Sequence, residues 1–337
     1  MEAGIHSRWD RERINNWYDQ RPWLIGCNFV PSNAVNQLEM WQAETYDPEC
    51  IDRELGWARN IGMNSVRVFL HDLVWENDPE GLIDRMRHFL KIADKFGILT
   101  MFVFLDDCWN SNPRPGKQPP AIPGVHNSRW LQSPGVSKVS DVSSWPRLER
   151  YIQSVLEEFT ADARILAWDL YNEPGNSDMG DKSLPLLRTV FDWARQVNPS
   201  QPLTAGLWSD LPGLNSFQLN ASDILTFHHY RTVTHMKNII REYQHHGRAI
   251  LCTEYLARAQ GSRFETHLPI FAHEKIGCFN WGLVAGKTQT YYPWGSQQGS
   301  PEPEVWFSDV LRKDGTPFDV EEVTFISALA QKYGGAY

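Results

Sequence analysis

Two glutamates interrupt strongly apolar stretches of the sequence, where a carboxylate is costly unless something pairs with it. Glu173 follows the run ILAWDLYN at 165–172, and Glu254 lies in AILCTEYL at 249–256. Two opposed carboxyl groups suit the hydrolysis of a glycosidic bond, in which a protonated acid aids the leaving group and an ionised carboxylate meets an oxocarbenium-like centre. The pair therefore indicates a hydrolytic site, if the fold brings the two side chains together.

This chemistry requires two different environments for the two carboxyl groups. The acid must be kept protonated by burial or by neighbouring negative charge, and the nucleophile must be kept ionised by hydrogen-bond donors. Arg67 and Tyr230 lie near the ends of two other apolar runs, and we expect them to donate hydrogen bonds to Glu254.

Strand-like apolar runs occur eight times along the chain and alternate with helical patterns. The runs are WLIGCNFV (23–30), SVRVFL (65–70), ILTMFVFL (98–105), ILAWDLY (165–171), LTAGLW (203–208), ILTFHHY (224–230), AILCTEYL (249–256) and CFNWGLV (278–284). Near-continuous apolar strands are typical of a parallel sheet that helices cover on both faces.

Apolar residues recur with a helical period between these runs. The segments with this period are 80–96, 147–160, 184–196, 234–246, 264–275 and 320–333. The pattern is clearest in the first of them, and Gly97 follows it as a predicted stop. The link between the fifth and sixth runs is short and is predicted to contain little helix.

Eight βα units in a chain of 337 residues predict an α/β fold, a (β/α)8 TIM barrel that occupies residues 1–337 as a single domain. A doubly wound open sheet is the alternative, but no GxGxxG or GxxxxGK[ST] turn follows any strand. Long connections at 106–145 and 285–319 follow the third and eighth strands, and loops of this length commonly form lids or substrate walls.

The C-terminal ends of barrel strands meet at one mouth, so the residues found there are the candidates for contacts around the two glutamates. Those residues are Arg67, Asp106, Asp107, Asn172, His228, Tyr230 and Trp281. The two aspartates are either sugar ligands or loop caps, and the arginine serves binding, a structural ion pair, or both. Aromatic faces pack against sugar rings, and the further candidates for such walls are Trp109, Trp208 and Trp294.

Adjacent histidines at positions 228 and 229 raise the question of a metal site. Neighbouring residues on a strand point to opposite faces, so only one of His228 and His229 is expected to face the mouth. Metal ligation by this pair is therefore not predicted. No cofactor is predicted either, because two carboxylates suffice for the hydrolysis.

The segments WDLYNEP at 168–174 and CTEY at 252–255 resemble the retaining glycoside hydrolases of the large barrel clan that includes the cellulase family, glycoside hydrolase family 5. The resemblance covers nearly the whole chain. It implies that Glu173, directly preceded by Asn172, is the general acid/base, and that Glu254 is the nucleophile of a double displacement.

The resemblance also implies contacts with the sugar. The matching residues are Arg67 at the end of strand two, Asn172 as the ligand of the sugar 2-hydroxyl, His228 and Tyr230 in a His-x-Tyr after strand six, and Trp281 as the platform of strand eight. Many family members carry a His near the end of strand three, whereas this chain reads FLDDCWN at 104–110. The class of sugar is left open for that reason.

Composition is that of a water-soluble enzyme, with 42% apolar and 22% charged residues. Fifteen Trp residues favour a carbohydrate substrate, and a net charge of −9 without a basic stripe argues against nucleic acid. The sequence contains no apolar stretch that would span a membrane and no leader-like segment. A cytoplasmic location is expected for the chain as given, and secretion if a leader has been removed.

The five cysteines lack CxxC spacing and are expected to be reduced thiols. The oligomeric state is not predicted. The leading hypothesis is a retaining β-glycosidase that hydrolyses β-linked glycans or oligosaccharides. A catalytically silent barrel that binds carbohydrate is the alternative, and a metal-dependent hydrolase is disfavoured because no His-x-His follows the first strand. The sugar, the linkage and the choice between exo and endo action are left open.

Overall fold

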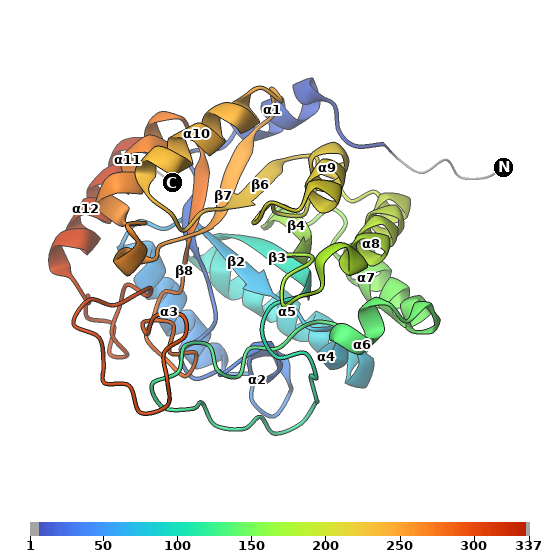
Figure 1. Cartoon of the computed structure of the whole chain (residues 1–337), viewed down its shortest axis with the longest axis horizontal. Helices are drawn as coiled ribbons and strands as arrows, with labels where there is room; N and C mark the ends of the chain where they lie inside the picture. The colour runs from blue at the N-terminus through green and yellow to red at the C-terminus, as the bar shows by residue number, and fades with distance from the viewer. Residues whose placement is uncertain (1–6, 335–337) are drawn as a thin grey trace.

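Eight parallel strands form one sheet at the centre of the molecule (Figure 1). The computed structural model describes residues 7–334. The order of the strands is β5-β4-β3-β2-β1-β8-β7-β6. Their bounds are β1 (Ile25–Asn28), β2 (Ser65–Phe69), β3 (Leu99–Asp106), β4 (Ile165–Asn172), β5 (Leu203–Thr204), β6 (Leu225–His228), β7 (Ile250–Tyr255) and β8 (Gly277–Trp281).

The sheet curls until β5 and β6 meet, although β5 is only two residues long. Beyond its end, the backbone nitrogen of Leu207 donates to the carbonyl of Thr226 at 2.9 Å, and the nitrogen of His228 donates to the carbonyl of Leu207 at 2.8 Å. The hydroxyl groups of Thr204 and Thr226 also lie 2.8 Å apart. The predicted (β/α)8 barrel is therefore confirmed, and the open sheet is excluded.

Helices surround the barrel and cover the outer face of the sheet (Figure 1). The α-helices are α1 (Arg11–Asp19), α2 (Gln37–Trp41), α3 (Pro48–Asn60), α4 (Asp72–Asn77), α5 (Pro79–Lys95), α6 (Val136–Val139), α7 (Trp145–Glu158), α8 (Leu184–Val197), α9 (Pro212–Ala221), α10 (Val233–Gln244), α11 (Phe264–His273) and α12 (Val320–Tyr333). Each of the helical segments predicted from the sequence forms a helix, with bounds that differ by a few residues at most.

The clearest of these helices, α5, begins and ends as its sequence indicates. The Asp78 side chain accepts a hydrogen bond from the nitrogen of Gly81 at 3.1 Å, and Pro79 occupies the first turn. Leu82, Met86, Phe89, Leu90, Ile92 and Ala93 are buried along one face. The chain leaves the helix through Gly97, whose φ of +64° is the left-handed conformation that suits glycine.

The prediction of little helix between β5 and β6 is wrong, because the ten-residue helix α9 lies there. Its sequence PGLNSFQLNA contains Gly, Ser and Asn, which favour turns and conceal a weak apolar pattern. Contacts with the barrel hold the helix in place: Leu214 and Gln218 are buried, and Gln218 Nε2 donates to the carbonyl of Gly206 at 2.6 Å. Tertiary contacts here outweigh intrinsic propensity.

The five cysteines are all free and buried, which confirms the prediction of reduced core thiols. Within residues 7–334, no helix combines the length and the apolar character needed to cross a membrane. The two long connections contain little regular structure. The one after β3 holds only the short helix α6 and a single 3₁₀ turn at Val142–Ser144 before α7 begins.

Candidate active site

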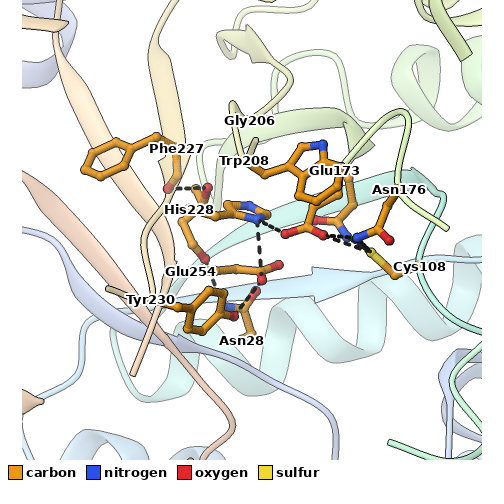
Figure 2. A network of polar contacts seen from close by, with 12 residues as sticks. Asn28, Cys108, Glu173, Asn176, Gly206, Trp208, Phe227, His228, Tyr230 and Glu254 are labelled. Carbon is orange, nitrogen blue, oxygen red and sulfur yellow. Dashed lines mark hydrogen bonds and ion pairs between the residues drawn. The ribbon is translucent and has the colours of Figure 1, made fainter. Parts of the chain in front are cut away.

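Glu173 and Glu254 lie on opposite sides of a cavity of about 950 Å³ at the C-terminal end of the barrel. Glu173 directly follows β4, and Glu254 belongs to β7. Figure 2 shows the two carboxyl groups turned toward one another, with His228 between them. Ligand atoms of these three residues all lie within 4.8 Å of one another. The fold therefore joins two carboxyl groups that are far apart in the sequence.

His228 links the two carboxyl groups through one ring nitrogen. Its Nδ1 lies 2.6 Å from Glu173 Oε1 and 3.4 Å from Glu254 Oε2. The pairing of β6 with β7 shifts register between Phe227 and His228: Phe227 pairs with Cys252 and His228 with Glu254, so Thr253 of β7 is the extra residue and His228 lies directly beside Glu254.

Glu254 is held by the two donors that the sequence predicts. Arg67 Nη1 donates to Glu254 Oε1 at 2.8 Å, and the hydroxyl of Tyr230 donates to Glu254 Oε2 at 2.7 Å. Arg67 is fully buried, and its Nη2 also donates to Asp169 Oδ2 at 2.8 Å. Both interpretations of this arginine therefore hold, because it forms a buried structural ion pair and holds a site carboxylate.

Glu173 is held by donors of another kind. Besides His228, Asn176 Nδ2 donates to Glu173 Oε2 at 2.5 Å, and the Cys108 thiol donates to the same oxygen at 3.3 Å. The backbone of Glu173 has a φ of +44°, a conformation that is uncommon for a residue with a side chain and that recurs at functional sites. The turn after Glu173 brings Asn176 back, since its nitrogen donates to the carbonyl of Glu173 at 3.0 Å.

Burial is the largest influence on the pKa of both carboxyl groups, and it favours their protonated forms. Burial and the charge of Glu173 raise the pKa of Glu254, against the opposing effects of His228, Arg67 and Tyr230. For Glu173, hydrogen bonds from His228 and other donors outweigh burial and lower the pKa. In this arrangement the pKa order is the reverse of the one that an acid at position 173 requires.

Asp106 does not line the cavity, so its placement does not support the prediction of a sugar ligand. It is buried beneath the cavity, and burial raises its pKa to about 7. Its Oδ1 accepts from Asn172 Nδ2 at 2.9 Å and from the nitrogen of Cys108 at 2.8 Å, while its Oδ2 accepts from Trp130 Nε1 at 2.7 Å. Asp106 orients residues that do line the cavity.

Asp107, like Asp106, is buried and does not line the cavity. Its Oδ1 accepts from the Tyr171 hydroxyl at 2.7 Å, and its Oδ2 accepts from the nitrogen of Gly175 at 2.8 Å and from Ser183. Burial raises its pKa to about 6. Asp107 thus anchors the turn that carries Glu173, which agrees with the alternative of a loop cap.

Asn172 lines the cavity, and its Oδ1 accepts from Arg67 Nη2 at 2.7 Å. Its amide is thereby oriented by a cation on one side and by an aspartate on the other.

Three further residues of the site were not predicted from the sequence: Cys108, Asn176 and Asn28. The Oδ1 of Asn28 accepts from Arg67 Nη1 at 2.8 Å. The signal available for the first two was their position directly after a polar strand end.

Aromatic side chains form much of the remaining lining. The predicted candidates that line the cavity are Trp109, Trp208, Trp281 and Trp294. Trp281 packs edge-on against Trp130, with ring centroids 5.5 Å apart, which fixes the orientation of the indole. Trp109 and Trp294 are 43% and 39% exposed, so their faces are open to a ligand.

Three of the site residues, Glu173, His228 and Glu254, have the geometry of a metal site. The Arg67 guanidinium, however, lies 2.8 Å from Glu254 and already supplies the positive charge that a cation would bring.

The prediction that only one of the adjacent histidines faces the mouth is wrong. His229 also lines the cavity and contacts His235 Nδ1 through Nε2 at 2.9 Å. It lies beyond the end of β6, where the alternation of a strand no longer applies.

Comparison with known proteins identifies relatives of the fold. No family model matches the chain, and no curated protein matches its sequence. Among solved structures, a GH5_18 protein from Streptomyces cattleya in complex with GlcNAc superposes with a TM-score of 0.67 at 12% identity, over 93% of this chain and 80% of that chain. An endo-β-1,4-mannanase from Thermotoga petrophila gives a TM-score of 0.62 at 13% identity, over 94% and 77%.

An exo-β-1,4-mannosidase from Opitutaceae bacterium strain TAV5 is also similar, with a TM-score of 0.63 at 17% identity. The match covers 93% of this chain and 60% of that chain. At these identities the likeness is one of fold. It places the molecule among (β/α)8 barrels, a group that includes these glycoside hydrolases.

Proposed function

We propose that the protein is a retaining β-glycosidase that hydrolyses β-linked glycans or oligosaccharides. The observation that carries the proposal is the approach of Glu173 and Glu254, which offer carboxylate oxygens within 4.8 Å of one another. Retaining enzymes hold their carboxyl groups about 5 to 5.5 Å apart, whereas inverting enzymes need about 6.5 to 9.5 Å to admit a water. The short separation favours a double displacement.

In the first step, Glu254 attacks the anomeric carbon while Glu173 protonates the departing oxygen. A covalent glycosyl ester forms on Glu254, and the glycosidic bond to the leaving group breaks. Glu173, now ionised, takes a proton from a water that attacks the same carbon and releases the sugar. Both carboxyl groups then return to their initial forms.

These roles follow from which charges in the site are permanent. Glu254 contacts the guanidinium of Arg67, which stays charged at all working pH values. Glu173 is held instead by Asn176, the Cys108 thiol and the imidazole of His228, which also approaches Glu254. His228 lowers the pKa of both carboxyl groups. The assignment of the nucleophile to Glu254 therefore rests on the contact with Arg67 and not on the order of the two pKa values.

The substrate class has support from the cavity and from the structural relatives. Indole faces line the cavity, and they suit the apolar faces of sugar rings. The relatives named above include an exo-β-1,4-mannosidase and an endo-β-1,4-mannanase, which supports a β-linked glycan as the substrate of this chain.

Two amide variants test the assignment of roles. Glu173→Gln is expected to lower kcat on an oligosaccharide by about 10²- to 10⁴-fold, the usual contribution of a general acid. An activated aryl glycoside needs no protonation, so its first turnover should stay fast while release of the sugar slows. Glu254→Gln is expected to abolish both steps. Rapid-quench and steady-state assays of the two substrates separate these patterns.

Glu157→Gln, on the exposed face of α7, is the matched control and should keep wild-type activity. Hydrolysis by Glu254→Gln at a near wild-type rate would show that the nucleophile is another group. Sugar binding without turnover of any nitrophenyl glycoside would favour the silent binding barrel. Loss of activity in a chelator, restored by a divalent metal, would favour the metal-dependent alternative.

A further inference from the structure

The two ends of the cavity are built differently. One end lies under the long loops that follow β3 and β8, which run beside one another along the lower edge of the molecule in Figure 1. The other end is bordered by the shorter loops that follow β5 and β6. The catalytic carboxyl groups lie between the two ends, so the difference decides how a chain of sugars can lie in the site.

The long loops are joined to each other by backbone contacts at residues that line the cavity. The nitrogen of His126 donates to Ser296 Oγ at 2.9 Å, and His126 Nδ1 lies 2.6 Å from the carbonyl of Tyr292. The nitrogen of Asn127 donates to the carbonyl of Thr288 at 2.8 Å. The loop after β3 is thus fastened to the loop after β8 beside the cavity.

Gln289 forms a second set of cross-links. Its Oε1 accepts from the nitrogen of Gly124 at 3.0 Å, and its Nε2 donates to the carbonyl of Ile122 at 2.8 Å. Close by, the nitrogen of Gly299 donates to the carbonyl of Pro123 at 2.8 Å. Together the two sets of bonds turn the two loops into one wall, which we call the β3–β8 wall (residues 122–130 and 288–299).

Aromatic rings continue the β3–β8 wall up to the catalytic centre. The centroid of the His126 ring lies 5.7 Å from that of Trp109 and 6.5 Å from that of Trp294. Trp294 in turn packs edge-on against Tyr230, with centroids 4.9 Å apart, and Tyr230 donates its hydroxyl to Glu254. The wall therefore reaches Tyr230, the side chain that donates to Glu254.

A polar side chain at the enclosed end of the cavity has no hydrogen-bond partner among residues 7–334. Asn127 lines the cavity and is 1% exposed. Neither its Oδ1 nor its Nδ2 has a hydrogen-bond partner among residues 7–334. A buried carboxamide without partners is costly, and a sugar hydroxyl can both donate to it and accept from it. The backbone of Asn127 is fixed by Thr288, so the amide is held at the wall.

The opposite end is open and lies on the side of the acid. Trp208 Nε1 donates to the carbonyl of Pro174, directly after Glu173, at 3.0 Å. Beyond Trp208, the cavity is lined by Ser209, Asp210 and Arg231, which are exposed. These exposed residues leave this end of the cavity open to solvent, whereas Trp281 packs against Trp130 of the wall.

From these contacts we propose that the enzyme acts in an exo manner, removing single sugars from the non-reducing end of a β-linked chain because the β3–β8 wall closes the cavity beyond one sugar. The proposal rests on the proposed glycosidase function and adds the mode of action. Terminal sugars would be recognised at the wall by Asn127, and the rest of the chain would lie over Trp208.

A reducing-end-labelled oligosaccharide tests the proposal, compared with the same compound whose non-reducing terminal sugar carries a bulky cyclic acetal. The expected result is release of monosaccharide from the first turnover, label that shortens one sugar at a time, and no cleavage of the blocked compound. Cleavage of the blocked compound at a comparable rate, or internal products at the start, would overturn exo action. If the unblocked compound and aryl glycosides also remain intact, the glycosidase function itself fails.

A variant of the β3–β8 wall tests whether the wall is the cause of exo action. Gln289 has a φ of +55°, so Gln289→Asn keeps a residue that tolerates this backbone and retracts the amide from its partners. Combined with Ser296→Ala, it should increase cleavage of the blocked compound relative to an aryl glycoside. Gln118→Asn is the matched control, because Gln118 bonds Asn36, Arg114 and Gly116 but nothing in the loop after β8. If the double variant cleaves the blocked compound and the aryl glycoside in the same ratio as the wild type, the proposed role of the wall is overturned.

Discussion

At the scale of single residues, the site depends on which donors hold each carboxyl group. Glu254 is held by Arg67 and Tyr230, and Glu173 is held by His228, Asn176 and a thiol. Arg67 places a permanent cation at Glu254, whereas the partners of Glu173 are an imidazole, an amide and a thiol. This asymmetry is what a retaining mechanism needs.

Removal of the Tyr230 hydroxyl tests the environment of the nucleophile. The hydrogen bond from Tyr230 lowers the pKa of Glu254, so Tyr230→Phe should raise that pKa. A smaller fraction of Glu254 is then ionised at acidic pH, and the acidic limb of the kcat/KM profile moves to higher pH. A bond to a charged group contributes about 1.5–3 kcal/mol, so kcat/KM on the acidic side should fall by at least about tenfold.

The control for this profile is Tyr333→Phe on α12, which lies outside the cavity and should leave the profile unchanged. An acidic limb of Tyr230→Phe that stays in place, or that moves to lower pH, would contradict the role assigned to the hydroxyl.

Residues at strand ends were predictable one at a time, but their partners were not. Arg67 and Tyr230 stand out in the sequence because a charged side chain interrupts the apolar run SVRVFL and a phenolic side chain ends the run ILTFHHY. Cys108 and Asn176 offer only their position after a strand as a signal, because a cysteine is typical of a small core residue and an asparagine after Pro-Gly is typical of a turn. Their contacts depend on a left-handed turn at Glu173 that sequence spacing does not specify.

At the scale of the elements, a buried ion pair connects strands across the interior of the barrel. Arg67 of β2 contacts Asp169 of β4 through Nε at 3.1 Å and Nη2 at 2.8 Å, and both side chains are fully buried. Burial is the largest influence on the pKa of Asp169 and raises it, although Arg67 opposes this effect. Strand β4, which Glu173 directly follows, is thus tied to β2, which carries the donor to Glu254.

Breaking this buried ion pair should lower the free energy of unfolding more than breaking an exposed ion pair would. Arg67→Met leaves Asp169 buried without its cation, and we expect the free energy of unfolding to fall by about 3–5 kcal/mol. The double variant Arg67→Met/Asp169→Leu should regain much of that stability, because no unpaired aspartate remains, yet it should stay inactive. Denaturant unfolding and an aryl glycoside assay measure the two effects. A single variant as stable as the wild type would contradict this account.

Apolar periodicity predicted the strands and helices correctly wherever packing and intrinsic propensity agree, as in α5. It failed where contacts with the rest of the barrel determine the local structure. Strand β5 pairs as a strand over two residues only, and α9 is fixed by Gln218 against the barrel. The register shift between β6 and β7 sets His228 beside Glu254, and His229 lies beyond the end of β6, so strict alternation could not have predicted that both line the cavity.

At the scale of the whole molecule, the barrel gathers residues from β4, β6, β7 and β8 and from the connections that follow the strands around one cavity, and two loops lie at one end of it. The number of apolar runs was enough to predict the barrel. The joining of the loops at 122–130 and 288–299 was not predictable, since it depends on backbone groups and on a few side chains such as Gln289. Loop lengths alone indicated a wall but not which end of the cavity it closes.

The configuration of the first product tests the central claim most directly. Hydrolysis of a β-glycoside followed by proton NMR should show the β-anomer first, with the α-anomer appearing only as mutarotation proceeds, because two displacements at one carbon restore its configuration. Initial formation of the α-anomer would mean a single displacement by water. It would contradict the account in which Glu254 forms a covalent bond to the sugar.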